Sequence, residues 1–186
     1  MKMLDGKTVL VTGAGLGVGR AIALACAEAG ANVAVNDIGA TLHGDPSGDS
    51  PAAKVTQEIQ SAGGNAITLT DSVADWNAAH SMIETTIKAF GSIDALINNA
   101  GNLRDVIFHK MSEEDFDAVI NVHLKGCFNM SRAAAPYFKE HGGGALLHMT
   151  STSGLVGNFG QANYCAAKLG IVGLSKAIAL DMQRFG

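Results

Sequence analysis

Residues 12–19 form a glycine-rich segment, TGAGLGVG, that constrains the fold more than any other part of the sequence. A β-rich apolar run at 8–11 precedes the segment, and apolar residues at helical spacing follow it as far as Gly30. We expect a left-handed conformation of Gly30 to end this helix, and a second apolar run follows at 32–35. The order predicts a strand–helix–strand unit in which the glycines form the turn into the helix.

The same alternation of strands and helices continues along the rest of the chain. Further strands are predicted at 66–69, 93–97 and 145–149. Further helices are predicted at 51–62, 79–90, 112–138 and 161–184. Ser50 and Ser112 are expected to cap the helices at 51–62 and 112–138, and Pro136 is expected to kink or end the second of these near its last turn. The pattern predicts an α/β fold with one dinucleotide-binding and catalytic domain over residues 1–186. Its doubly wound, Rossmann-like parallel sheet carries helices on both faces and a ligand at the carboxyl ends of the strands.

Composition argues against several classes of protein. The 186 residues are 47% hydrophobic, which is enough for a substantial core. With 17 acidic and 13 basic side chains, the chain lacks the cationic surface that nucleic acids require. The three cysteines are far apart and are expected to be core thiols, and the six histidines show no ligand spacing, so no metal is expected. Without a signal pattern or a long apolar stretch, a soluble, cytoplasmic protein with no membrane partner is expected.

The glycine segment has the chemistry of a dinucleotide site. Its glycines allow a tight turn and let a pyrophosphate approach the free amides of a helix N-terminus, although the spacing is T-G-x-x-x-G-x-G rather than G-x-G-x-x-G. Asp37, just after the second strand, can accept both hydroxyls of an adenosine ribose and repel a 2′-phosphate, which favours NAD over NADP. Two alternatives stay open, because Asp37 could be a turn residue before Gly39 and Arg20 could pair with a phosphate. Residues 38–49 form a long polar loop that is either functional or mobile.

A second group of candidates lies toward the end of the chain. Tyr164 and Lys168 are four residues apart on the last predicted helix, so they share a face, and an ammonium group beside a phenol favours the phenolate. Such a pair can act as an acid/base, but it also occurs as a packed ring beside a solvated charge. Ser151 follows the fifth strand and can hold a substrate oxygen. Its rivals in the same segment are the hydroxyls of Thr150, Thr152 and Ser153.

Together these motifs resemble the short-chain dehydrogenase/reductase family over essentially the whole chain. The matching residues are the segment 12–19, Asn98-Asn99-Ala100-Gly101, Asn121, Ser151 and Tyr164-Cys165-Ala166-Ala167-Lys168. The resemblance implies that Tyr164 is the proton donor or acceptor, that Lys168 binds the nicotinamide ribose, that Ser151 positions a carbonyl and that Asn121 anchors a water relay. The cofactor contacts that we expect, partly from this resemblance, are Gly13, Gly15, Leu16, Gly17, Gly19, Asp37, Asp71, Ser72, Asn98, Ala100, Gly101, Tyr164 and Lys168.

Within that family, residues 35–39 and 157–164 are similar to the dehydrogenase part of peroxisomal multifunctional enzymes of type 2, which oxidise (3R)-hydroxyacyl-CoA, and to bacterial relatives. Family members continue beyond residue 186, so we expect this chain to be a fragment that lacks the C-terminal strands and the substrate-covering loop. The resemblance also implies a homo-oligomer, a dimer or tetramer, formed through the helices at 112–138 and 161–184.

The function that these features predict is an NAD-dependent oxidoreductase that interconverts a secondary alcohol and a ketone, with hydride transfer to or from the nicotinamide. Two other functions remain compatible with the sequence. One is a non-catalytic dinucleotide sensor on the same fold. The other is an NADPH-dependent carbonyl reductase.

Overall fold

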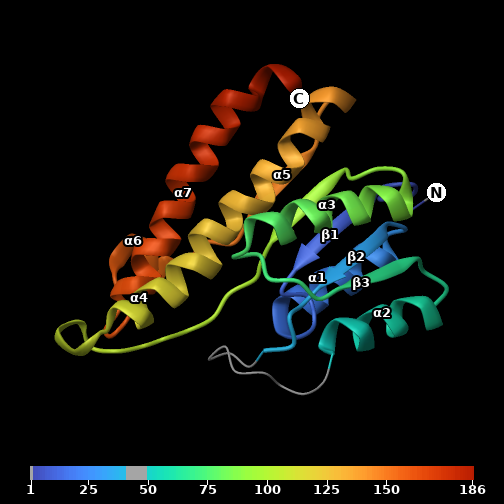
Figure 1. Cartoon of the computed structure of the whole chain (residues 1–186). Coiled ribbons are helices and arrows are strands. Elements are labelled where there is room, and N and C mark those ends of the chain that lie inside the picture. Colours follow the sequence, from blue (N-terminus) through green and yellow to red (C-terminus); the bar gives the residue numbers. More distant parts are fainter. Residues whose placement is uncertain (1, 41–49) are drawn as a thin grey trace.

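A five-stranded parallel sheet forms the centre of the computed structural model, which describes residues 2–40 and 50–186 (Figure 1). The strands are β1 (Thr8–Thr12), β2 (Asn32–Asn36), β3 (Ala66–Leu69), β4 (Ala95–Asn98) and β5 (Ala145–His148). Their order in the sheet is β3-β2-β1-β4-β5. All five predicted strands are present, although β4 begins two residues after the predicted start at residue 93. Most of the predicted polar loop, residues 41–49, lies outside the described part of the chain.

Helices cover both faces of the sheet, as the alternating pattern predicted. The helices are α1 (Gly17–Glu28), α2 (Pro51–Ser61), α3 (Trp76–Phe90), α4 (Glu113–Ile120), α5 (Gly126–His141), α6 (Thr152–Val156) and α7 (Ala162–Met182). Side chains along a strand point alternately to the two faces. Leu10 of β1 packs in one core with residues of α3 and α5, whereas Val9 and Val11 pack in the other with residues of α1 and α2.

The helix ends follow the predicted capping signals. The Ser50 hydroxyl accepts the N–H of Ala53 at 3.3 Å, and Pro51 is the first residue of α2. Ser112 and Asp115 form the predicted capping box, with reciprocal N···O distances of 3.1 and 3.2 Å. These caps satisfy backbone donors that have no partner within the helix, so they fix where each helix begins.

The predicted helix at 112–138 differs from the structure in two ways. It continues to His141, so Pro136 does not end it. It is also interrupted by a π-helical turn, η2 (Asn121–Lys125), in which the carbonyl of Asn121 accepts the N–H of Gly126. A π turn contains one extra residue, which rotates the following side chains by about 100° around the axis. Nothing in the apolar spacing predicted this turn, the short helix α6, or the 3₁₀ turns η1 (Phe108–Lys110) and η3 (Gln183–Phe185).

Strand β5 lies at one edge of the sheet and is less buried than the central strands. Leu147 is 51% exposed, whereas Leu10 and Leu96 are fully buried. Helix α7 lies beside α5, on the side of the molecule that also carries α4 and α6 (Figure 1). Within residues 2–40 and 50–186, no helix is both long and apolar enough to cross a bilayer.

Candidate active site

The sheet order creates a switch point between β1 and β4. From β1 the chain turns one way to β2 and β3, and β4 and β5 lie on the other side, so the loops after β1 and β4 leave the sheet next to each other. In sheets of this kind, ligands bind at the carboxyl ends of the strands at such a point. The glycine segment, Asp37, residues 98–101 and Ser151 all follow carboxyl ends of strands and therefore meet at this edge.

The two loops at the switch point are held together by hydrogen bonds. The Thr12 hydroxyl accepts the N–H groups of Asn99 and Ala100, both at 3.0 Å. The side-chain amide of Asn99 donates to the carbonyls of Thr12 and Gly13, also at 3.0 Å. The shape of the glycine turn therefore depends on Asn99, which was not among the predicted cofactor contacts even though it lies inside a matching motif.

The glycines of the turn are required by close packing and by backbone conformation. A Cβ on Gly19 would overlap the carbonyl of Gly13 and the amide of Asn99. Gly13 and Gly17 have φ values of 60° and 54°, which side-chain-bearing residues rarely adopt. The turn can therefore keep this shape only with glycine at these positions.

The start of α1 is open to an anion. Its N-cap, Leu16, forms no capping hydrogen bond through its side chain, and the first turn carries no acidic residue. Leu16 is 66% exposed at the same edge. The first amides of α1 therefore lack a side-chain cap, and the partial positive charge of a helix N-terminus favours a phosphate there.

Asp37 is fixed beside the glycine turn. One carboxylate oxygen accepts the N–H of Gly15 at 3.0 Å and the other accepts the N–H of Gly39 at 2.9 Å. A Cβ on Gly15 would lie 2.8 Å from the Asp37 carboxylate, so the backbone can approach it only as glycine. Arg20, the alternative phosphate partner, instead forms a surface ion pair with Glu58 at 2.7 Å.

The loop after β3 is held from two sides. The Asn36 amide donates to the carbonyl of Asp71 at 2.9 Å, and the Asn129 amide of α5 donates to the carbonyl of Val73 at 3.0 Å. Ser72 accepts the N–H of Ala74 at 3.2 Å. The Asp71 side chain is exposed. These backbone contacts place Asp71 and Ser72 beyond the end of β3, the strand next to β2.

Asn98 faces the helix layer rather than the open edge. Its buried amide donates to the Ser131 hydroxyl at 3.2 Å. Ser131 also contacts Nε2 of His148 at 2.9 Å, and Nδ1 of His148 lies 3.2 Å from the Ser175 hydroxyl. The Asn98 side chain therefore belongs to a hydrogen-bonded network that runs from β4 through α5 and β5 to α7. Gly101, three residues on, is exposed at the edge of the sheet.

Tyr164 and Lys168 lie on successive turns of α7, as their spacing predicted. The Lys168 ammonium donates to the carbonyl of Met149 at 2.6 Å and lies 5.5 Å from the centroid of the Tyr164 ring. Lys168 is only 5% exposed, and burial lowers its pKa, an effect that Cys127 partly opposes. A cation is thus anchored between the end of β5 and the face of the phenol.

The hydroxyls after β5 have different partners. The Ser151 oxygen caps α6 by accepting the N–H of Ser153 at 3.1 Å, so its own hydrogen remains available to donate. The Thr150 hydroxyl donates to the carbonyl of Lys168 at 2.8 Å, which commits it to α7. Thr152 is exposed. The Thr150 hydroxyl therefore links the segment after β5 to α7.

The π-helical turn brings His123, rather than Asn121, against Tyr164. The two rings lie edge to face, with centroids 5.1 Å apart and an interplanar angle of 88°. Asn121 is half-buried, and its side chain forms no hydrogen bond within the described residues. Sequence reasoning missed His123. The signal that was present is its four-residue spacing from Val119 and Cys127, which are both buried.

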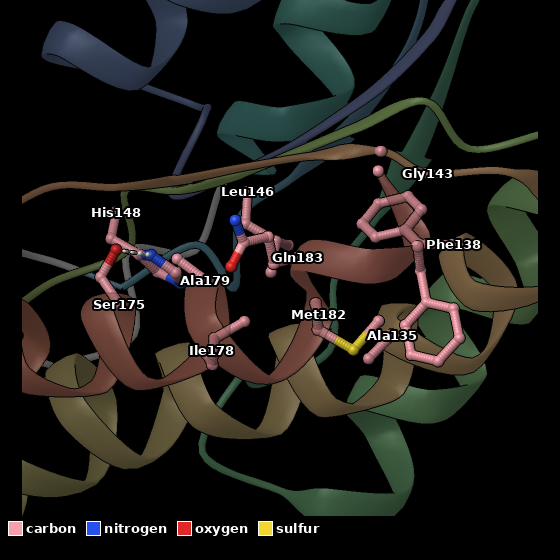
Figure 2. A pocket seen from close by; sticks show the side chains of 13 residues that line it. Ala135, Phe138, Gly143, Leu146, His148, Ser175, Ile178, Ala179, Met182 and Gln183 are labelled. Carbon is pink, nitrogen blue, oxygen red and sulfur yellow. Dashed lines mark hydrogen bonds between the residues drawn. The ribbon is translucent and has the colours of Figure 1, made fainter.

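A cavity of about 280 Å³ lies between α5, β5 and α7, away from Tyr164 and Lys168. Figure 2 shows His148 and Ser175 hydrogen-bonded to each other at one end of the cavity, with Ile178 and Met182 along its length. Burial lowers the pKa of His148. Elsewhere in the described ranges, no group of three or more His, Cys, Asp or Glu side chains is arranged to hold a metal ion.

The doubly wound parallel sheet therefore has a glycine turn at its switch point and a tyrosine–lysine pair at the same edge, where such sheets bind dinucleotides. The sequence model of the short chain dehydrogenase family matches residues 7–186. The chain belongs to this family.

Relatives share both the sequence and the fold. Over 177 residues the chain is 50% identical to peroxisomal multifunctional enzyme type 2 of Mus musculus, and the match covers 95% of this chain and 24% of that enzyme. It is 41% identical to a 3-oxoacyl-[acyl-carrier-protein] reductase of Staphylococcus aureus, over 100% of this chain and 72% of the reductase. The crystal structure of a short chain dehydrogenase from Mycobacterium avium superposes with a TM-score of 0.91 and 49% identity, covering 98% of this chain and 65% of that one. The chain thus spans about a quarter of the mouse enzyme and about two thirds of the mycobacterial protein.

Proposed function

We propose that the protein containing this chain interconverts a secondary alcohol and a ketone with NAD, and that Tyr164 is the acid/base. The observation that carries the proposal is the position of Tyr164 and Lys168. They lie one helical turn apart on α7, and the Lys168 ammonium is anchored on the carbonyl that follows β5, at the sheet edge where the glycine turn also ends. A buried cation beside a phenol would stabilise the negative charge that develops on the phenolic oxygen.

The residues at the switch point fit a dinucleotide. The uncapped amides at the start of α1 would hold the pyrophosphate, and the glycine turn of Gly13, Gly15 and Gly17 leaves room for it. The remaining contacts in this proposal are Leu16, Gly19, Asp37, Asp71, Ser72, Asn98, Ala100, Gly101, Tyr164 and Lys168. When bound, the nicotinamide supplies the hydride acceptor or donor. For Ala100 the contact would come from its carbonyl or its side chain, because its N–H is already hydrogen-bonded to Thr12. The Asn98 amide donates to Ser131 and the Asn98 carbonyl accepts the Met149 N–H, so its contact would use the second lone pair of that carbonyl.

Within this proposal the four side chains have different tasks. Tyr164 takes the hydroxyl proton when the alcohol is oxidised and returns it in the reverse reaction. Ser151, whose oxygen already accepts the Ser153 N–H, donates its hydrogen to the substrate oxygen. Lys168 stabilises the charge on the phenol and binds the nicotinamide ribose, and Asn121 anchors a water relay.

NAD is preferred over NADP in this proposal because of Asp37. Its carboxylate is held against the glycine turn by two backbone donors, where it would accept ribose hydroxyls and repel a 2′-phosphate. The nearby cation that could favour NADP, Arg20, is paired with Glu58. Both observations support the proposed preference.

We further propose a 3-hydroxyacyl thioester as the substrate. The names of the relatives include a 3-oxoacyl-[acyl-carrier-protein] reductase, and Leu155, Val156 and Phe159 are 66%, 83% and 83% exposed just before Tyr164. Exposed apolar side chains beside the acid/base would suit an acyl chain. We also propose that the protein forms a homo-oligomer and is cytoplasmic.

The test is to follow NADH formation by the protein at its natural length, with a panel of secondary alcohols and 3-hydroxyacyl-CoAs. We expect turnover with NAD and the fastest rates with the thioesters. NADH binding without turnover of any alcohol in the panel would contradict the proposal and support a dinucleotide sensor. Faster turnover with NADPH and ketones would instead support a carbonyl reductase.

A further inference from the structure

We propose that His123 is a positioning residue that holds Tyr164 against the loop after β4. The proposal rests on the acid/base function proposed for Tyr164 and adds a residue that none of the sequence motifs includes. His123 is 4% exposed and lies in the π-helical turn η2, between α4 and α5. The extra residue of this turn sets the rotation of the helix at this point, so the turn determines which side chain faces α7.

The imidazole contacts two parts of the site at once. Its Nε2 lies 2.8 Å from the carbonyl oxygen and 3.1 Å from the backbone nitrogen of Asn102, the residue that follows the Asn98–Gly101 motif. The ring also meets the Tyr164 ring edge to face, at a centroid distance of 5.1 Å. A Cβ on Gly101 would overlap the imidazole, so the loop is packed closely against it. His123 therefore bridges the loop that follows β4 and the proposed acid/base of α7.

A purely space-filling role does not explain a histidine here. Burial, together with the charge of Lys168, lowers the pKa of His123 to about 4, so the ring is neutral near neutral pH. In a neutral ring Nε2 can donate to Asn102 O or accept from Asn102 N, but not both. The Nδ1 atom is buried and has no partner among the described residues. A buried polar atom without a partner is destabilising, so an apolar side chain would serve better if only volume mattered.

What the bridge provides is a fixed position for the phenol. Proton transfer requires the phenolic oxygen to be held at hydrogen-bond distance from the substrate hydroxyl, and small displacements slow such steps strongly. Asn163, the neighbour of Tyr164, is anchored through its amide to the carbonyls of Arg104 and Asp115, both at 2.9 Å. Asn163 thus fixes the backbone at the start of α7, whereas His123 contacts the tyrosine ring itself.

The experiment separates the two contacts of the imidazole in the protein at its natural length. His123→Gln keeps a polar group at the reach of Nε2 and loses the ring, whereas His123→Phe keeps the ring and loses the bonds to Asn102. With NAD and (3R)-3-hydroxybutyryl-CoA as probes, we expect kcat to fall by roughly 10- to 100-fold in both variants. The NADH dissociation constant should change less than about twofold. His141→Gln, an exposed histidine at the end of α5, is the matched control and should leave kcat unchanged.

A second readout does not depend on activity. Residues 1–186 contain two tyrosines, Tyr137 and Tyr164. In NMR of tyrosine-labelled protein with NADH bound, Tyr164→Phe and Tyr137→Phe assign their signals, and Tyr137 serves as an internal reference. Both His123 variants should shift or broaden the Tyr164 ring signals and leave those of Tyr137 unchanged. Unchanged Tyr164 signals in a folded variant, or kcat within twofold of the native value in both variants, would overturn the proposal. If the native protein turns over no alcohol, the proposed function fails and the tyrosine signals alone decide whether His123 positions Tyr164.

Discussion

At the scale of single residues, the backbone holds the carboxylate of Asp37 in a fixed orientation. Two N–H groups hold its carboxylate, and neither bond involves another charged side chain. A carboxylate that is already oriented loses little conformational freedom when a ribose binds. The same fixed charge would lie close to a 2′-phosphate, where like charges repel.

Removing this charge should change the cofactor preference. In Asp37→Asn, which removes the charge and keeps one of the two oxygen acceptors, we expect the ratio of NAD to NADP affinity to fall by roughly tenfold, because about 1.4 kcal/mol of repulsion corresponds to that factor. The ratio is measured by fluorescence titration with NADH and NADPH. Arg20→Ala is the control and should leave the NADH affinity unchanged, because Arg20 is paired with Glu58. An unchanged ratio in Asp37→Asn would argue against a role of Asp37 in the choice of cofactor.

His123 should also make the fold sensitive to acid. Its pKa is lowered from 6.5 to about 4 by burial and by Lys168, so between these two values the unfolded chain binds a proton that the folded chain does not. Stability is therefore greatest above the unfolded pKa and falls as the pH drops through this window, by up to about 3 kcal/mol. Burial lowers the pKa of His148 too, which adds a fall of the same sign.

Urea unfolding at several pH values between 6.5 and 4 measures this effect. We expect the free energy of unfolding of the native protein to fall more steeply across the window than that of His123→Gln. His141→Gln, at an exposed position, should keep the native slope. Parallel curves for the native protein and His123→Gln would show that the ring is not buried in its neutral form.

The residues that sequence analysis identified are those with local signatures. Tyr164 and Lys168 are four residues apart on one helix, and their shared face follows from helix geometry alone. The anchoring of Lys168 on the Met149 carbonyl, 19 residues away, depends on how β5 and α7 pack. The contact between His123 and Tyr164 depends on a π turn that has no recognised sequence signal, so the sequence alone could not reveal it.

At the scale of elements, α1 and α7 contain glycines that have opposite consequences for their helices. Gly19 lies where α1 crosses the glycine turn, and a Cβ there would overlap the Gly13 carbonyl and the Asn99 amide. Gly173 lies on the exposed side of α7, and a Cβ there would meet nothing within 4 Å. Close packing therefore requires the first glycine, whereas the second only weakens its helix.

This contrast predicts changes of stability with opposite signs. Gly173→Ala should raise the free energy of unfolding by about 0.5–1 kcal/mol, because alanine loses less conformational freedom in a helix. Gly19→Ala should lower it by about 1–3 kcal/mol, because the added methyl group has no space. Urea unfolding of the two variants gives the comparison. If both substitutions stabilised the protein, the close approach of α1 to the glycine turn would be wrong.

Helix starts could be predicted better than helix interiors. The caps at Ser50 and Ser112 depend on one side chain and a few neighbouring backbone groups, so both predictions are confirmed. Pro136 was expected to kink or end its helix, yet the helix continues for five more residues to His141. Proline removes a single backbone donor, and the surrounding packing of α5 against the sheet compensates for the loss.

At the scale of the whole molecule, the strand order matters most for function. The alternation of strands and helices predicted a doubly wound sheet, and the order β3-β2-β1-β4-β5 confirms it. This order brings Gly13, Asp37 and Ser151, which are far apart in sequence, to one edge of the sheet. The order itself could not be read from the sequence, because which strands become neighbours depends on long-range pairing.

The chain is shorter than the relatives it matches, and it exposes large apolar side chains on β5 and α7. It spans 65% of the mycobacterial protein of known structure. Leu147 of β5 and Leu180 of α7 are 51% and 75% exposed. The proposed activity, substrate and oligomer therefore have to be tested on the protein at its natural length.

The central claim is that the phenol of Tyr164 transfers the proton in the chemical step. The most direct test is single-turnover formation of NADH by Tyr164→Phe, with Tyr137→Phe as the control. We expect the rate of the step to fall by roughly 100- to 10,000-fold in Tyr164→Phe, with NADH binding retained and the control unchanged. A single-turnover rate within a few-fold of the native rate in folded Tyr164→Phe would contradict the claim.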